Sequence, residues 1–530
     1  MSLSRRELLA LVAGVPLAGL VGCGRHGRLS FEGELLSPDF ATGHRLRDGW
    51  QPPEPTQPPT RHRVVIVGAG MAGLAAAWRL KKNDVEDVVV LELSDSPGGT
   101  ALSGSRDGFR FPWGAHYVPV PMTENVELLS LFEEMDVVVG RDDAGKPIVD
   151  EQYLCRDPEE RVFSEVWDAG LFPTTGATQD DLDQAERFRL EMNEWAARRD
   201  RRGRRYFAIP IAQATDERTV LDLDTLSMAT WMTERGFDSK RLRWLVDYSC
   251  RDDYGLTIEQ TSAWAGIFYF ASRLIGDGTE SQAVITWPEG NGRIVDYLAS
   301  QTPGLRCSHA VCSIQQDSGG VTVRAFDTAA EKTLDFQANR LIFAAPQFLA
   351  PRLIRGWPQA NRSVKQLQYG AWTVANVHLS DRPQEEDGMM CWDNVIMDSH
   401  SLGYVTSTHQ LGSDYGPTVL TWYRPLLDND PRVSRTELMR LTWDDWATVV
   451  VSDLKRAHPD IDPLVRRIDV MRWGHAMIQP RIGLVTSREL SLARQPLGRI
   501  HFAGTDLSGV ALMEEAFFHG VRAADEAMDG

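Results

Sequence analysis

The pattern of apolar and polar positions predicts a mixed α/β chain. Residues 64–67 and 88–91 are unbroken apolar runs, typical of strands buried on both faces of a parallel sheet. The alanine-rich stretch between them predicts a helix, so the three elements form a strand–helix–strand unit. Further strands are expected at residues 283–286, 321–325, 340–343 and 372–379.

The middle of the chain predicts helices. A long charged amphipathic pattern covers residues 179–202, and a second helix is expected over 225–235, ended by Gly236. A third is expected over 258–273, where Thr257 and Gln260 form a capping box. Strand-rich and helix-rich blocks therefore alternate along the chain, which favours two interleaved domains over one domain in each half.

A glycine-rich turn joins the first predicted strand to its helix. Gly68, Gly70 and Gly73 have G-x-G-x-x-G spacing, and Glu92 follows the second strand. In such a unit the first glycine permits the tight turn, the second lets the backbone approach a pyrophosphate, and the third lets helix and strand pack closely. The acid binds the adenosine ribose and repels a 2′-phosphate, so NADP is excluded and NAD or FAD is expected.

Composition narrows the class of protein. Of 530 residues, 42% are hydrophobic and 25% are charged, values ordinary for a globular enzyme. The formal net charge is −18, and no basic cluster with interleaved aromatics stands against it, so we expect no nucleic-acid partner.

The first 23 residues predict an export signal. Arg5 and Arg6 form a twin-arginine motif, residues 8–22 are apolar but short for a membrane span, and Cys23 ends a sequence that resembles a lipoprotein cleavage box. We expect export by the twin-arginine route, lipidation of Cys23 and anchoring at a membrane surface in the periplasm or cell envelope. The alternative is a cleaved signal without lipidation.

Residues 24–60 are expected to be a tether that ends in a proline-rich spacer, with five prolines between Pro52 and Pro59, although Leu29 to Leu36 contains enough apolar residues to pack against another part of the protein. The other five cysteines include no C-x-x-C pair and show no metal-ligand spacing with histidines, so we expect no metal site.

The C-terminus carries a second motif. Residues 499–506 read RIHFAGTD, MEEA follows at 513–516, and GVRAA at 520–524. Together they resemble the closing flavin motif of the FAD-dependent flavin amine oxidase family, which is monoamine oxidase-like. Three further segments are similar to that family: PGGT at 97–100, the flavin-facing turn WGAHYV at 113–118, and the adenine-pairing strand AVCSI at 310–314.

The resemblance implies an FAD/NAD(P)-binding Rossmann-like domain with an interleaved α+β substrate domain. The FAD-binding domain would comprise residues 61–150, 280–350 and 488–530, and the substrate domain 151–279 and 351–487. FAD is the implied cofactor, held non-covalently because no cysteine follows Cys391. The residues implied to bind it are Gly68, Gly70, Met71, Ala72, Gly73, Glu92, Gly98, Gly99, Thr100, Gly114, Ala115, Val311, Gly504, Asp506, Met513 and Ala516.

Three departures from the family concern its chemistry. The lysine near flavin N5 should fall near Val374, in a segment without lysine; one substrate-flanking tyrosine is replaced by Leu512, and the other is missing from residues 479–482. Glu515 stands where the family has glycine, as an acid of the first helical turn. The candidates for catalytic residues are His116, Tyr117, Trp473 and His475, with His519 as a further histidine.

The resemblance implies a two-electron oxidation in which hydride passes from a substrate C–H to flavin N5, with an amine or amino acid as the small-molecule substrate. Two alternatives stay open: a carotenoid desaturase- or isomerase-like enzyme acting on a hydrophobic substrate, and a non-catalytic electron-transfer flavoprotein. Carboxylates and aromatics at the flavin would favour an amine, and an apolar pocket would favour the desaturase. Since the N5 lysine is missing, we expect a quinone or redox carrier as the electron acceptor.

Overall fold

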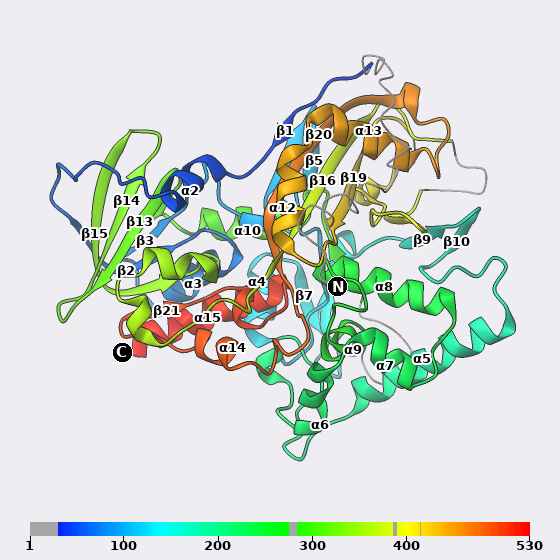
Figure 1. Ribbon diagram of the computed structural model, residues 1–530, viewed down its shortest axis with the longest axis horizontal. Coiled ribbons are helices and arrows are strands. Elements are labelled where there is room, and N and C mark those ends of the chain that lie inside the picture. The colour runs from blue at the N-terminus through cyan, green and yellow to red at the C-terminus, as the bar shows by residue number, and fades with distance from the viewer. Residues whose placement is uncertain (1–29, 275–282, 385–389, 414, 530) are drawn as a thin grey trace, which may run out of the picture.

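Two large β-sheets organise the chain in the computed structural model, which describes residues 30–274, 283–384, 390–413 and 415–529 (Figure 1). The predicted signal and Cys23 lie outside the described residues. Within the described parts, no helix is long and apolar enough to span a bilayer.

The first sheet has seven strands from three separate parts of the chain. Its order is β12 (Leu305–Arg306), β3 (Val88–Leu91), β2 (Thr60–Val67), β15 (Lys332–Phe343), β14 (Val321–Asp327) and β13 (His309–Gln316), with β21 (Ile500–Phe502) also paired to β15. The pairs β12–β3, β3–β2, β2–β15 and β15–β21 are parallel, and β13–β15 form an antiparallel meander. The apolar runs at 64–67 and 89–91 are buried inside this sheet, as their composition predicts, and Val88 is partly buried.

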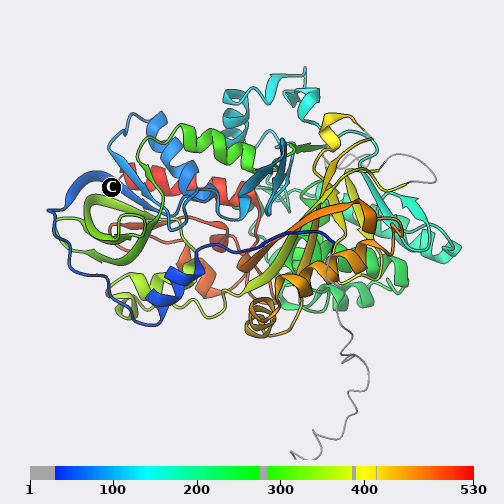
Figure 2. The same cartoon turned by 90° about the horizontal axis from the view of Figure 1, so that it is seen from above.

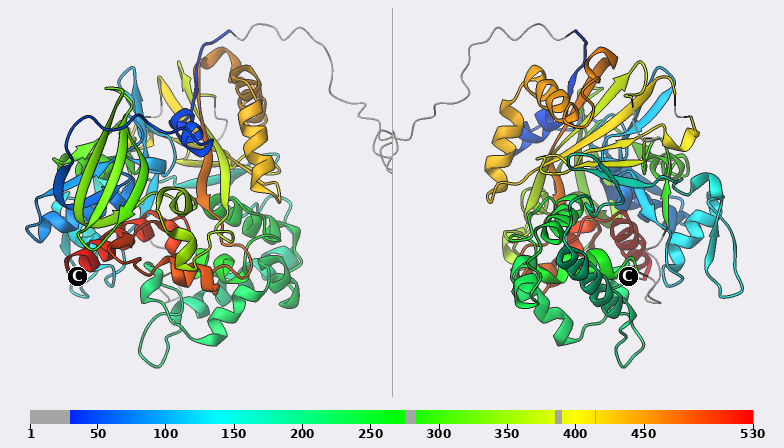
Figure 3. Two further views of the ribbon diagram at one scale, coloured as in Figure 1. Left: turned by 60° about the vertical axis from the view of Figure 1, so that its left-hand side comes forward. Right: turned by 90° about the vertical axis from the view of Figure 1, so that its right-hand side faces the viewer.

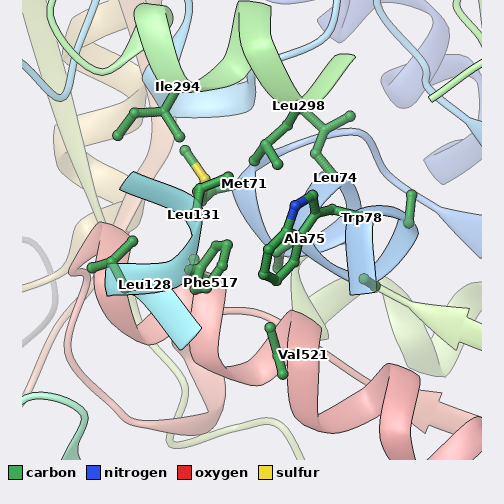
Figure 4. Packing of buried hydrophobic residues seen from close by; sticks show 14 of the residues in the cluster. Met71, Leu74, Ala75, Trp78, Leu128, Leu131, Ile294, Leu298, Phe517 and Val521 are labelled. Atoms are coloured by element: carbon green, nitrogen blue, oxygen red, sulfur yellow. The ribbon is translucent and has the colours of Figure 1, made fainter. Parts of the chain in front are cut away.

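One face of the first sheet is covered by helices from both ends of the chain. Helix α3 (Met71–Lys82) packs along α15 (Met513–Asp529), with α4 (Val126–Glu134) and α10 (Gly292–Ser300) beside them (Figure 4). Helices α3 and α15 approach each other closely at Gly520, where an added Cβ would lie 2.2 Å from the Ala72 carbonyl oxygen. The C-terminal helix is thereby fixed against the glycine-rich turn.

The second sheet has eight strands. Their order is β1 (Leu35–Leu36), β20 (Val465–Ile478), β16 (Tyr369–Leu379), β19 (Thr418–Leu426), β18 (Tyr404–Thr406), β17 (Asp393–Ile396), β9 (Glu160–Phe163) and β10 (Trp167–Ala169). Helix α13 (Trp443–Leu454) covers one face through Trp446 and Val450, with α12 (Pro431–Arg440) alongside. The opposite face carries Trp372, Tyr423 and Trp473, which form one apolar cluster with Phe111 and Trp113 of the first domain.

A helical block lies below the second sheet and contains α5 (Gln179–Ala197), α7 (Met228–Glu234), α8 (Lys240–Tyr254) and α9 (Ala263–Ala271) (Figures 1 and 3). Helix α9 begins at Ala263, not at residue 258, because Ser262 caps it by accepting a hydrogen bond from the Ala265 N–H. The expected α/β fold with a Rossmann-like domain and an interleaved second domain is confirmed by the two sheets.

The assignment of residues 24–60 as a tether is wrong for the part that the structure describes. Leu35 and Leu36 pair with β20, residues Phe40–Arg47 form α2, and Trp50 packs edge-on against Phe326 of β14 with ring centroids 5.1 Å apart. The prolines suggested a spacer, but the apolar side chains before them have two sheets on which to pack. Figure 2 shows this segment in dark blue, crossing from the second sheet to the first.

Candidate active site

A cavity of about 1640 Å³ runs between the two sheets. This exceeds the roughly 300–1,000 Å³ of an ordinary small-molecule pocket, so it can take a dinucleotide and a small substrate together. All the residues expected to bind cofactor line it except Gly73, and so do all four main catalytic candidates, His116, Tyr117, Trp473 and His475.

The glycines of the two motifs leave room on the cavity side. A Cβ at Gly70 or at Gly504 would meet no atom within 4 Å, although both residues line the cavity. Gly73 lies behind the turn, where a Cβ would come within 1.9 Å of the Gly68 carbonyl oxygen. The backbone thus offers open space at the N-terminus of α3, where a pyrophosphate binds favourably, and this geometry fits FAD.

Two carboxylates of the site, Glu92 (partly buried) and Asp506 (buried), accept hydrogen bonds from the chain around them. The Glu92 carboxylate accepts hydrogen bonds from the Ala69 N–H (2.7 Å) and the Ser94 N–H (2.9 Å), and burial raises its pKa. The Asp506 carboxylate accepts from the Gln347 N–H and the Tyr369 hydroxyl, both at 2.6 Å. Each oxygen of Glu92 keeps a lone pair for a ribose hydroxyl.

The expected flavin-facing turn, Trp113 to Tyr117, is clamped by the second sheet. The Trp473 indole N–H donates to the Trp113 carbonyl at 2.6 Å, and the Tyr423 hydroxyl donates to the Gly114 carbonyl at 2.9 Å. Trp473 therefore orients the turn from behind as well as lining the cavity.

We predict that Trp473→Phe lowers the free energy of unfolding by about 1–3 kcal/mol. The ring is 8% exposed, and phenylalanine fills most of its volume but leaves the buried Trp113 carbonyl without its donor. Urea unfolding of the FAD-loaded protein measures the change. Trp443→Phe is the matched control, because the half-buried Trp443 indole donates to the Ile468 carbonyl and Trp443 is not among the described residues that line the cavity. The absorbance spectrum of bound flavin is a second measurement: it should change in Trp473→Phe and stay the same in Trp443→Phe.

His116 lies in the middle of an aromatic group on the cavity wall. Its ring centroid is 4.9 Å from that of Tyr423, 5.2 Å from Tyr117 and 5.5 Å from Trp392. Burial lowers the pKa of His116 to about 4, so the imidazole is neutral at pH 7. An amine approaching this wall meets aromatic faces and no histidine cation.

Two acidic residues of α8 also belong to the cavity wall. Asp252 and Asp253 line the cavity together with Arg273. Asp253 accepts a 2.7 Å hydrogen bond from Arg273, and their side chains are 5% and 13% exposed. Within the described parts of the chain Asp252 has no hydrogen bond or ion pair, and burial together with the Asp253 charge raises its pKa to about 7.

Two adjacent glutamates at the N-terminus of α15 lie in different surroundings. Glu514 lines the cavity beside Met513, and burial raises its pKa to about 7. Glu515 points away and accepts from the Ile211 N–H (2.6 Å) and from Ser508, so the expectation of an ordinary first-turn acid is wrong: its side chain is fully buried. His519 binds the Ser508 hydroxyl at 2.8 Å and is absent from the described cavity wall.

His475 lies in a different part of the cavity from His116. Its ring stacks on Phe348 with centroids 4.4 Å apart, and burial lowers its pKa to about 4. Val374, where the family places its lysine, is 2% exposed and belongs to the apolar cluster with Trp372 and Tyr423. Of the cations in the described part of the cavity wall, Arg273 is the one beside Asp252 and Tyr117.

The sequence interpretation missed Asp252, Arg273 and Tyr423. A signal was present for the first of them: Asp252 and Asp253 occupy the last turn of α8, just before Gly255 ends the helix with φ +59°. Carboxylates at a helix C-terminus are destabilised by the helix dipole, so two in succession indicate a site that needs negative charge. Nothing in the local pattern around Tyr423 distinguishes it from a core residue.

Comparison with known proteins identifies the frame around this cavity. Residues 71–528 match the model of the flavin-containing amine oxidoreductases. Polyamine oxidase 1 of Zea mays is 24% identical over 284 residues, which are 50% of this chain and 50% of that protein. The chain thus spans about half the length of this curated relative.

Solved structures share the fold. A triple mutant of putrescine oxidase superposes with a TM-score of 0.67 and 19% identity over 89% of this chain and all of that one. A CLA-producing fatty acid isomerase from P. acnes gives 0.63 and 14% over 88% of this chain and 98% of that one. At these identities the structures establish the fold, and one fold serves both amine and hydrocarbon chemistry.

Proposed function

The chain belongs to the flavin-containing amine oxidoreductase family and is an FAD-dependent oxidoreductase, and from this premise we propose that it oxidises an amine or amino acid. The observation that carries the proposal is Asp252, a carboxylate without a hydrogen bond or ion pair among the described residues, on the cavity wall that also carries Tyr117 and Tyr423. A cationic amine supplies the partner that this buried charge lacks.

Each group on this wall has a role in the proposed reaction. Bound FAD supplies a two-electron acceptor for the hydride that leaves the substrate carbon. Asp252 pairs with the substrate ammonium and takes its proton, which frees the nitrogen lone pair to form the C=N bond as the hydride departs. Tyr117 and Tyr423 bind the cation and its alkyl groups against their rings, and neutral His116 adds no repulsion.

The desaturase-like alternative is less well supported by the cavity. A hydrocarbon chain packed against Asp252, Asp253 and Glu514 would bury three acidic groups with Arg273 as their one counter-cation on the described wall. A non-catalytic electron-transfer protein would not need a substrate-sized cavity beside the flavin-facing turn. The hypothesis of an amine substrate accounts both for the acidic groups on the wall and for the cavity volume beside the flavin-facing turn.

Anaerobic bleaching of the flavin absorbance tests the proposal. The purified FAD-loaded protein is mixed with panels of amines, amino acids and apolar alkenes in the absence of oxygen. We expect bleaching by members of the amine or amino acid panels only. Bleaching by an alkene alone would support the desaturase alternative, and no bleaching by any panel would contradict an oxidase or dehydrogenase role.

We also propose that the electrons pass to a quinone or redox carrier, since the place of the family lysine is filled by buried Val374. Slow recovery of absorbance in aerated buffer and fast recovery with a soluble quinone are the expected results; fast recovery in air would contradict them.

Export and anchoring by the twin-arginine signal and Cys23 are part of the same proposal, since a cell-envelope enzyme meets membrane quinones. Cys23→Ser should release the protein from membranes. Equal membrane retention of the variant and the unaltered protein would argue against a lipid anchor.

A further inference from the structure

The N-terminal strap, residues 32–54, lines part of the cofactor cavity and is held at both ends by contacts with the two sheets. At one end Leu35 and Leu36 pair in parallel with β20, and the Ile468 N–H donates to the Glu32 carbonyl at 3.0 Å. Arg467 adds ion pairs to Glu32 (3.0 Å) and Glu34 (2.7 Å). This end therefore belongs to the second sheet.

The other end of the strap is held by the first domain. Trp50 packs on Phe326, Arg45 lies over the Trp50 ring at 4.1 Å, and Glu54 pairs with Arg324 of β14 at 2.9 Å. Between the two ends, Arg352 donates to the Arg47 carbonyl at 3.1 Å, which ties α2 to the helix that follows β15. Figure 1 shows the strap in blue, passing from β1 to α2 and on beside β13–β15.

The strap faces the cavity at the end where Glu92 and Val311 lie. Eleven residues of the strap line the cavity, among them Leu36, Phe40, His44, Arg47 and Trp50. Ser94, Ser308 and Thr328 of the first domain line it as well, and α2 lies against β13. The first domain alone therefore leaves this side of the nucleotide site open, and the strap supplies the missing wall.

We propose that the N-terminal strap is a cofactor-retaining element that closes the cavity over the adenosine half of FAD. On this side of the cavity, bound FAD would have to pass the strap in order to leave. Loosening an anchor should therefore speed release of FAD while the two sheets and their cores stay intact. The proposal concerns cofactor binding alone and does not depend on the identity of the substrate.

The test is the rate at which the FAD-loaded protein loses its flavin, followed by the fluorescence of released FAD after dilution. Trp50→Ala should raise this rate at least about tenfold, equivalent to about 1.4 kcal/mol. Trp167→Ala is the control: that ring also packs against a phenylalanine, Phe163 at 5.2 Å, and an arginine, Arg161 at 3.8 Å, with His458 as a further contact at 5.7 Å, but it lies on β10 and is not among the described residues that line the cavity. The control should stay within about twofold of the unaltered protein.

Two further measurements keep the test decisive if Trp50→Ala folds poorly. Replacing residues 36–51 by a glycine-serine linker of equal length should also speed FAD release. Trypsin should cut after Arg45 and Arg47 more slowly in the FAD-loaded protein than in the apoprotein. Unchanged FAD release in both variants, or equal cleavage with and without FAD, would overturn the proposal.

Discussion

Asp252→Asn should lower kcat/KM for the best amine substrate roughly 30- to 1000-fold, or about 2–4 kcal/mol. The substitution keeps the shape of the side chain but removes the charge that would pair with the substrate ammonium in a cavity wall made of Tyr117 and Tyr423. FAD content and the flavin spectrum should not change, because Asp252 lies on α8 in the second domain, outside the motifs that hold the cofactor.

The pH profile separates this role from a structural one. Burial and Asp253 raise the pKa of Asp252 from its ordinary value near 3.8 to about 7, so the carboxylate becomes able to pair with an ammonium only as the pH rises through about 7. The unaltered protein should show kcat/KM rising across that range, and Asp252→Asn should lose this rise. Glu514, whose pKa is also about 7, stays in both proteins and should not restore it.

The same shift predicts the opposite sign for stability. Between about pH 4 and 7 the unfolded chain loses the Asp252 proton while the folded protein retains it, so folding stability from this group falls as pH rises. Asp252→Asn should thus be at least as stable as the unaltered protein at pH 8. Asp247→Asn, on the same helix and paired with Arg251 outside the cavity, is the control and should keep its activity. Equal activity in Asp252→Asn and the unaltered protein would contradict the amine proposal.

The parts of the site that bind the cofactor could be predicted because their chemistry is local. Gly68, Gly70 and Gly73 act through backbone geometry within six residues, and Glu92 is reached through one helix and one strand. The resemblance of residues 499–506 to the family motif works in the same way, since β21 and α15 place this stretch beside β15 and α3. Short-range geometry is encoded in short-range sequence.

The substrate wall could be predicted only at His116 and Tyr117, because four distant segments build it. His116 lies in the flavin-facing turn, Asp252 in the last turn of α8, Arg273 just after α9 and Tyr423 in β19. Arg273 and Tyr423 are ordinary residues in their own segments, and only the packing of the second sheet on the first brings all four together. The N-terminal strap illustrates the same limit: its prolines are visible in the sequence, but the two sheets that bury Leu35 and Trp50 come from elsewhere in the chain.

Gly70→Val should weaken FAD binding at least about 100-fold, which is about 2.7 kcal/mol, without unfolding the apoprotein. Gly70 lines the cavity with φ −73°, a conformation that valine adopts freely, and its Cβ would meet no protein atom within 4 Å. The added side chain therefore fills only the space where the pyrophosphate is expected at the N-terminus of α3. Loss of a glycine cap costs the apoprotein no more than about 1 kcal/mol, measured by urea unfolding.

Two other glycines show whether the loss belongs to the site. Gly140→Val, in β7 (Val138–Arg141) with its nearest atom 4.0 Å away, should bind FAD as the unaltered protein does. Gly73→Ala should lose both FAD and stability, because its Cβ would lie 1.9 Å from the Gly68 carbonyl oxygen and force α3 away from β2. If Gly70→Val bound FAD normally by titration, the phosphates could not lie at this turn. The three variants together distinguish a glycine that is required for packing of the fold from a glycine that leaves room for the cofactor.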